Sequence, residues 1–103
     1  MGPEMSASEK SIGYLTPMAR YLIWAMEGRG IMTTQAIYRA VKKKCAEFDR
    51  PLPDKWESEI RQTLQAHCPS RPQWNRKDDF FVYHRRGYWS CKVTTPPGVV
   101  DLL

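Results

Sequence analysis

The sequence has no apolar run long enough to cross a membrane as a helix. Its longest uninterrupted apolar run extends only from Tyr21 to Met26, whereas a membrane helix needs about 20 such residues. Residues 1–10 are polar and acidic and lack the apolar segment of a secretory signal. We therefore predict a cytoplasmic protein with no signal peptide and no membrane partner.

Cysteine is scarce, and its spacing argues against a disulfide framework and a zinc site. Cys45, Cys68 and Cys91 are odd in number and far apart in the sequence, unlike the closely spaced ligand pairs of zinc sites. Without an export signal they are expected to be reduced thiols. We expect Cys45 and Cys91 to be buried as small apolar residues, and we predict no metal and no cofactor.

The sequence also lacks the residue patterns of common catalytic sites. It has two histidines, His67 and His84, no nucleophile patterned with either, and no glycine-rich phosphate loop. The neighbouring carboxylates Asp78 and Asp79 precede a predicted strand, where such residues usually form a turn or oppose aggregation. We therefore predict a binding domain and not an enzyme.

What the chain does have is enough apolar sequence for one core and an excess of positive charge. Its 103 residues, 42% of them hydrophobic, suit one globular domain. Sixteen lysines and arginines against eleven acidic residues give a net charge of +5. Such a charge is typical of domains that bind polyanions, although many basic domains bind none. We predict a disordered lead-in at 1–13, the domain at 14–93 and a tail or linker at 94–103.

Two helices are predicted in the first half of the domain. The first extends from the N-cap Thr16 and the following Pro17 to Gly28. The second begins at Thr33 or Thr34 and ends before the prolines at 51 and 53. Its predicted buried stripe has helical spacing and consists of Ile37, Val41, Cys45 and Phe48.

A third helix and a β-hairpin complete the predicted domain. The helix begins at Asp54, which with Glu57 resembles a capping box, and it ends before Pro69. Strands are predicted at 80–83 and 88–93, joined by a turn at 84–87. Three helices followed by a hairpin predict an α+β fold, the winged helix of the helix-turn-helix class. The predicted inward residues are Trp56, Ile60, Leu64 and His67 of the helix, and Phe80, Val82, Trp89, Cys91 and Val93 of the hairpin.

The outward face of the third helix carries side chains that can read base edges in a major groove. Arginine pairs with guanine and glutamine with adenine through two hydrogen bonds each. An alternative is that this face is merely solvated, as in most helices. The predicted base contacts are Ser58, Arg61, Gln62 and Gln65.

Basic residues in the loop and hairpin are predicted to contact the DNA backbone, as a wing lying along phosphates would require. A surface that only confers solubility is the alternative. These residues are Arg71, Arg76, Lys77, Arg85, Arg86 and Lys92. Within the loop, Trp74 either stacks on an extruded or modified base, with Gln73 and Asn75 reading its edge, or closes the core beneath the hairpin.

The run from Glu59 to Ser70, followed by Trp74, Asp78-Asp79-Phe80 and Gly87-Tyr88-Trp89, resembles a bacterial winged-helix module. This family accompanies HNH-type and related nuclease domains in modification-dependent restriction endonucleases, and some members are similar to domains that read N6-methyladenine. The resemblance implies recognition of duplex DNA, with Arg61, Gln62 and Gln65 at the bases. The sequence departs from the family at Cys68-Pro69 and in having no nuclease domain.

The leading hypothesis is a double-stranded-DNA-binding domain that serves as the recognition module of a restriction system. Its expected target is methylated DNA, such as DNA carrying N6-methyladenine, and a parent chain would carry any nuclease domain. Two alternatives remain at this point: a sequence-specific transcriptional regulator and a winged helix that binds another protein.

Overall fold

The computed structural model describes residues 16–93. The predicted lead-in and tail lie outside the described residues. In chain order the elements are α2 (Pro17–Met26), β1 (Met32–Thr33), α3 (Thr34–Glu47), α4 (Trp56–Ala66), β2 (Phe81–Arg85) and β3 (Tyr88–Cys91). The three strands form an antiparallel sheet in the order β1-β3-β2. The described residues therefore confirm an α+β fold.

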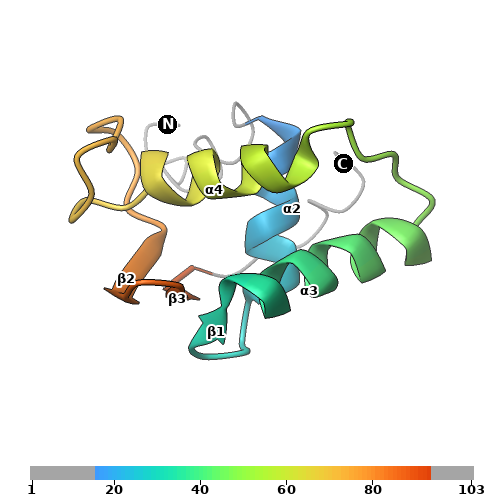
Figure 1. The fold of residues 1–103 in the computed structure, drawn as a ribbon, viewed down its shortest axis with the longest axis horizontal. Coiled ribbons are helices and arrows are strands. Elements are labelled where there is room, and N and C mark those ends of the chain that lie inside the picture. Colours follow the sequence, from blue (N-terminus) through green and yellow to red (C-terminus); the bar gives the residue numbers. More distant parts are fainter. Residues whose placement is uncertain (1–15, 94–103) are drawn as a thin grey trace, which may run out of the picture.

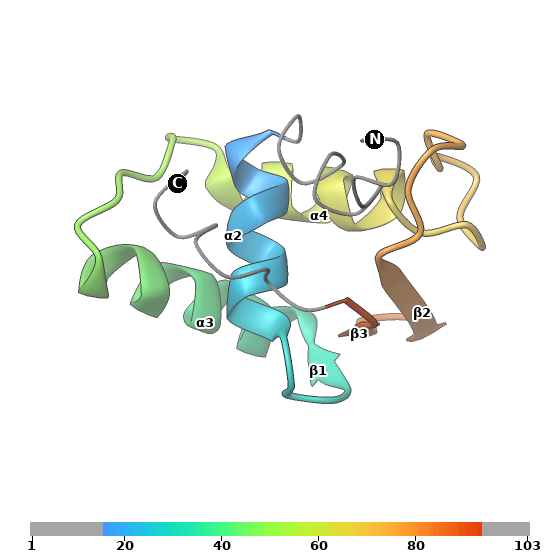
Figure 2. The ribbon, with the colours of Figure 1, turned by 180° about the vertical axis from the view of Figure 1, so that it is seen from behind.

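Helix α2 is the central element and packs against both α3 and α4 (Figures 1 and 2). Eight of its ten residues are buried. They are Met18, Ala19 and all six residues from Tyr21 to Met26. Leu22 meets Ile37 of α3, Ile60 and Leu64 of α4 and Phe81 of β2 in one cluster of buried residues. A helix buried on nearly every face must be apolar throughout, and the run from Tyr21 to Met26 meets this requirement.

The predicted caps hold for two helices and fail for the third. Thr16 accepts a hydrogen bond from the Ala19 amide, and Thr33 accepts one from the Ala36 amide. The capping box predicted at Asp54 and Glu57 is wrong, because α4 begins after Lys55 and has no side-chain cap. Asp54 lies in the turn before that N-cap position, too early to reach the first free amides. The acidic residues in the first turn of α4 favour the helix dipole instead.

Phe48 does not belong to the buried stripe of α3, contrary to the prediction. It is 46% exposed, whereas Ile37, Val41 and Cys45 are buried as expected. The helix ends at Glu47, so helical spacing no longer directs the Phe48 side chain inward. Its ring instead lies against Trp24 of α2, with ring centroids 4.8 Å apart.

The inward face of β2 is also shifted by one residue from the prediction. Phe81 pairs with Cys91 and Tyr83 with Trp89, which leaves Val82 opposite Ser90 on the other face. Phe80 is buried, but it precedes the strand and its amide donates to the carbonyl of His67. Because this bond ties Phe80 to the end of α4, the strand alternation begins at Phe81 and places Phe81 in the core.

The strand β1 was not predicted, because two residues give no alternating pattern. Met32 pairs with Trp89 and Thr33 with Tyr88, so β3 lies in the middle of the sheet. The cysteines are free thiols, with Cys45 and Cys68 buried and Cys91 half-buried. In the part of the chain described, no helix has the length and apolar character needed to span a membrane.

Candidate functional site

A groove of about 270 Å³ lies where α4, the loop after it and the hairpin turn meet. Three arginines from these three segments line it: Arg61 of α4, Arg71 of the loop and Arg86 of the turn. We call this feature the arginine groove. No carboxylate is among its lining residues in the described part of the chain. The remaining lining residues are Thr34, Leu64, Gln65, Tyr83, Gly87 and Trp89.

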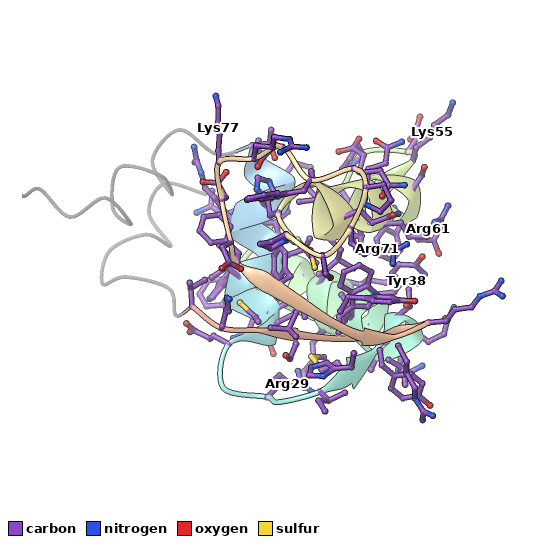
Figure 3. The ribbon with its side chains drawn as sticks, turned by 90° about the vertical axis from the view of Figure 1, so that its left-hand side faces the viewer. Arg29, Tyr38, Lys55, Arg61, Arg71 and Lys77 are labelled. Carbon is purple, nitrogen blue, oxygen red and sulfur yellow. The ribbon has the colours of Figure 1, made fainter. Side chains whose placement is uncertain are left out.

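Arg61 is held on the outer face of α4 by a tyrosine of the neighbouring helix. Its Nη1 donates a 2.7 Å hydrogen bond to the hydroxyl of Tyr38 (Figure 3). Tyr38 itself is 8% exposed and packs edge-on against Trp56. Because the phenol ring is fixed by this packing, the guanidinium of Arg61 is restrained although its residue is exposed.

Arg71 is held in the groove by an aromatic ring of the sheet. Its guanidinium carbon lies 4.3 Å from the ring centroid of Tyr83 in β2, a favourable cation–π distance. Its Nε is buried and has no hydrogen-bond partner. Figure 3 shows Arg61, Arg71 and Tyr38 close together on one side of the molecule, with Lys77 at a distance from them.

The loop that carries Arg71 is fixed by a polar cluster that joins the buried side chains of His67 and Asp78 to Asn75, which is exposed. The His67 Nδ1 lies 3.1 Å from Asp78 Oδ2, and the Asn75 amide nitrogen donates to the same carboxylate oxygen. The backbone amide of Asn75 donates to the carbonyl of Ala66 at the end of α4. Burial lowers the pKa of His67 from its ordinary value, and the charge and hydrogen bond of Asp78 act in the opposite direction.

The residues predicted to contact a modified base are arranged around this cluster and do not line the arginine groove. The indole N–H of Trp74 donates to the carbonyl of Asp78 at 2.7 Å. The Asn75 side-chain oxygen accepts from the backbone amides of Lys77 and Asp78. The structure therefore directs the polar groups of Trp74 and Asn75 into the loop, while Gln73 is exposed. Trp74 is half-buried and is not among the partly buried residues packed against the core in the described part of the chain, so both interpretations of its ring stay predictions.

The predicted base contacts all lie on α4, but only two of them face the groove. Arg61 and Gln65 line it, whereas Ser58 and Gln62 do not. Arg61 and Gln62 are exposed, and Ser58 and Gln65 are half-buried. The outer face of α4 thus continues from the groove onto open surface.

The predicted backbone contacts separate into four groups. Arg71 and Arg86 line the groove, and the Arg85 guanidinium lies 4.3 Å from the ring centroid of Tyr88. Lys92 forms an exposed 2.8 Å ion pair with Asp79. The remaining two, Arg76 and Lys77, are exposed in the loop.

Sequence reasoning missed the residues that position the arginines. Tyr38 and Arg61 are 23 positions apart, so no local pattern links them. Tyr83 was assigned only to a strand, and the burial of Asp78 beside His67 also depends on tertiary contact. Among residues 16–93, no three His, Cys, Asp or Glu side chains are grouped so that they could hold a metal ion.

Comparisons with known proteins give no match to this chain, whether with protein-family models, curated proteins or solved structures.

Proposed function

We propose that this protein binds double-stranded DNA through the outer face of α4 and the adjoining hairpin. The observation that carries the proposal is the convergence of Arg61, Arg71 and Arg86 on one groove without a lining carboxylate. Guanidinium groups match phosphate geometry and are weakly hydrated, so they are well suited to a polyanionic partner. The net charge of +5 has the same sign as this groove.

The order of elements supports a winged-helix domain. A helix, a short strand, two helices and a hairpin follow one another, and β3 pairs with both β1 and β2. In helix-turn-helix proteins the recognition helix lies in the major groove, which is wide enough to admit one helix. We assign this role to α4, because its exposed Arg61 and Gln62 can reach base edges or phosphates.

The proposed biological setting is a modification-dependent restriction system, with this domain as the part that reads methylated DNA. This setting rests on the sequence resemblance alone. Burial of one methyl group contributes only on the order of 1 kcal/mol, so strong discrimination needs steric exclusion or unpaired polar groups when the methyl is missing. The domain itself is proposed to be non-catalytic, and a nuclease domain would belong to a parent chain.

Fluorescence anisotropy with three forms of one duplex pool tests the proposed function. The duplexes are unmodified, adenine-methylated or cytosine-methylated, each at about 50 mM and about 200 mM salt. Tighter binding to one methylated form would support the reading of methylated DNA. Equal binding that weakens steeply with salt would support DNA binding without methyl recognition, as in a transcriptional regulator. No binding to any duplex would refute the proposal and favour a protein partner.

A further inference from the structure

The arginine groove has the chemistry of a site for one anionic group. Arg61, Arg71 and Arg86 come from three segments, and no carboxylate among the lining residues neutralises them. Like charges gathered in one groove repel one another, and an anion bound between them removes this repulsion. The groove is smaller than the pockets of roughly 300–1,000 Å³ that enclose whole small-molecule ligands, so it suits a charged group of a larger ligand.

The way the arginines are held leaves donors available for such a group. Tyr38 engages one nitrogen of Arg61, and the guanidinium carbon of Arg71 lies over the ring of Tyr83. The Arg71 Nε is buried without a hydrogen-bond partner. Because this atom is closed off from solvent, a phosphate in the groove would contact the terminal guanidinium nitrogens of Arg71 and not its Nε.

We propose that the arginine groove holds one backbone phosphate of the duplex between Arg61, Arg71 and Arg86, and that Arg61 therefore positions the domain and does not read a base. This inference rests on the proposed function. It replaces the predicted base contact of Arg61 and leaves base reading to the part of α4 outside the groove, where Ser58 and Gln62 lie.

The salt dependence of binding tests whether the arginines share one phosphate. Each neutralised phosphate contributes about 0.9 to the slope of log K against log salt concentration. This slope is negative, and losing a phosphate contact makes it shallower. Replacement of all three arginines by glutamine should therefore reduce its magnitude by about 1, whereas the loss of three separate phosphates would reduce it by roughly 3. The single substitution Arg61→Gln should weaken binding about tenfold. Its effect and that of Arg71→Gln should be non-additive, because both side chains contact one group.

The matched control is a triple variant with the same change in charge away from the groove. Arg29, Arg39 and Lys43 are exposed. Figure 3 shows Arg29 well separated from Arg61 and Arg71, and helical spacing places Arg39 and Lys43 off the face of α3 that carries Thr34 and Tyr38. Replacement of these three residues by glutamine should weaken binding less than the groove triple variant. Equal losses for the two triple variants would overturn the proposal while leaving DNA binding intact.

Selection from a randomised duplex pool, followed by sequencing, distinguishes a phosphate contact from a base contact. Arg61→Gln should weaken binding uniformly and leave the preferred sequences unchanged. A changed preference at one base position would overturn the proposal and identify Arg61 as a base-reading residue. A slope whose magnitude falls by roughly 3 in the groove triple variant would also overturn it. If the wild-type protein binds no duplex at either salt concentration, the proposed function itself fails, and the phosphate site with it.

Discussion

The Tyr38 hydroxyl and Arg61 Nη1 are joined by a 2.7 Å hydrogen bond between α3 and α4. A buried tyrosine thus restrains an exposed arginine at the edge of the groove. Because the guanidinium is restrained before a ligand arrives, less side-chain entropy is lost on binding. The hydrogen bond should therefore contribute to binding affinity, and a substitution that removes only the hydroxyl measures this contribution.

Tyr38→Phe should weaken duplex binding about threefold to tenfold, the equivalent of roughly 0.5–1.5 kcal/mol for one hydrogen bond. The ring and its packing against Trp56 are kept, so the melting temperature should change little. Fluorescence anisotropy and thermal unfolding measure the two effects. Tyr21→Phe is the matched control, because Tyr21 is a buried tyrosine of α2 that does not line the groove, so its loss of a hydroxyl should leave binding unchanged. Equal effects of the two variants would contradict the role of the Tyr38 hydroxyl.

Asn75→Ala should destabilise the protein by about 1–3 kcal/mol, because its partners lose their hydrogen bonds and one of them, Asp78, is buried. The affected groups are the Asp78 carboxylate and the backbone amides of Lys77 and Asp78. Urea unfolding followed by circular dichroism measures the change. Gln73→Ala, an exposed neighbour in the same loop, should change stability by less than about 0.5 kcal/mol. Unchanged stability of Asn75→Ala with lost affinity for modified DNA would instead support its role in base recognition.

Acidification should reduce stability through His67. Burial keeps its folded-state pKa below the ordinary value of 6.5, so the unfolded chain binds the proton more readily. Neutral His67 makes its full contribution to the free energy of unfolding above pH 6.5. This contribution is lost as the pH falls toward the lower folded-state pKa. Urea unfolding between about pH 7.5 and about pH 5.5 should show this decline.

The two histidines provide the comparison for this pH dependence. His67→Gln should make the dependence shallower, because the buried titrating group is gone. His84→Gln should leave the contribution of His67 in place, since His84 is exposed and pairs with Ser90 on the hairpin. The same slope for the wild-type protein and His67→Gln would contradict the prediction.

Phe81→Ala should cost about 3–5 kcal/mol, the usual range for removing a fully buried aromatic ring. Phe81 is 1% exposed, whereas Val82 lies half-buried on the other face of the hairpin. Val82→Ala should therefore cost clearly less. Chemical unfolding of the two variants tests the strand register directly. A larger loss of stability for Val82→Ala than for Phe81→Ala would indicate that Val82 faces the core, as the sequence predicted.

Local signals are sufficient to predict the helices, because threonine caps and helical spacing act over a few residues. Thr16, Pro17 and Thr33 set two helix starts as expected. The face of β2 is not a local property. It depends on the hydrogen bond from the Phe80 amide to the His67 carbonyl, which joins the strand to the end of α4.

The site shows the same division between local and tertiary information. Charge and position identify Arg61, Arg71 and Arg86 individually, but their convergence needs the fold that brings α4 and the hairpin together. The polar residues beside Trp74 had a plausible local role in base reading. In the structure, the Asn75 side-chain oxygen accepts hydrogen bonds from two amides of its own loop, and its role in base reading stays a prediction.

The short strand β1 has a mechanical consequence for the hairpin. The Thr34 amide donates to the carbonyl of Gly87, one residue from Arg86, and β1 pairs with β3 directly beside this bond. These bonds attach the tip of the hairpin to the first turn of α3, so the hairpin and α3 form one rigid unit. A duplex that binds here meets two fixed supports, α4 and the hairpin tip. Any bending or groove widening needed for contact must then come from the DNA, so sequences that deform easily should bind more tightly.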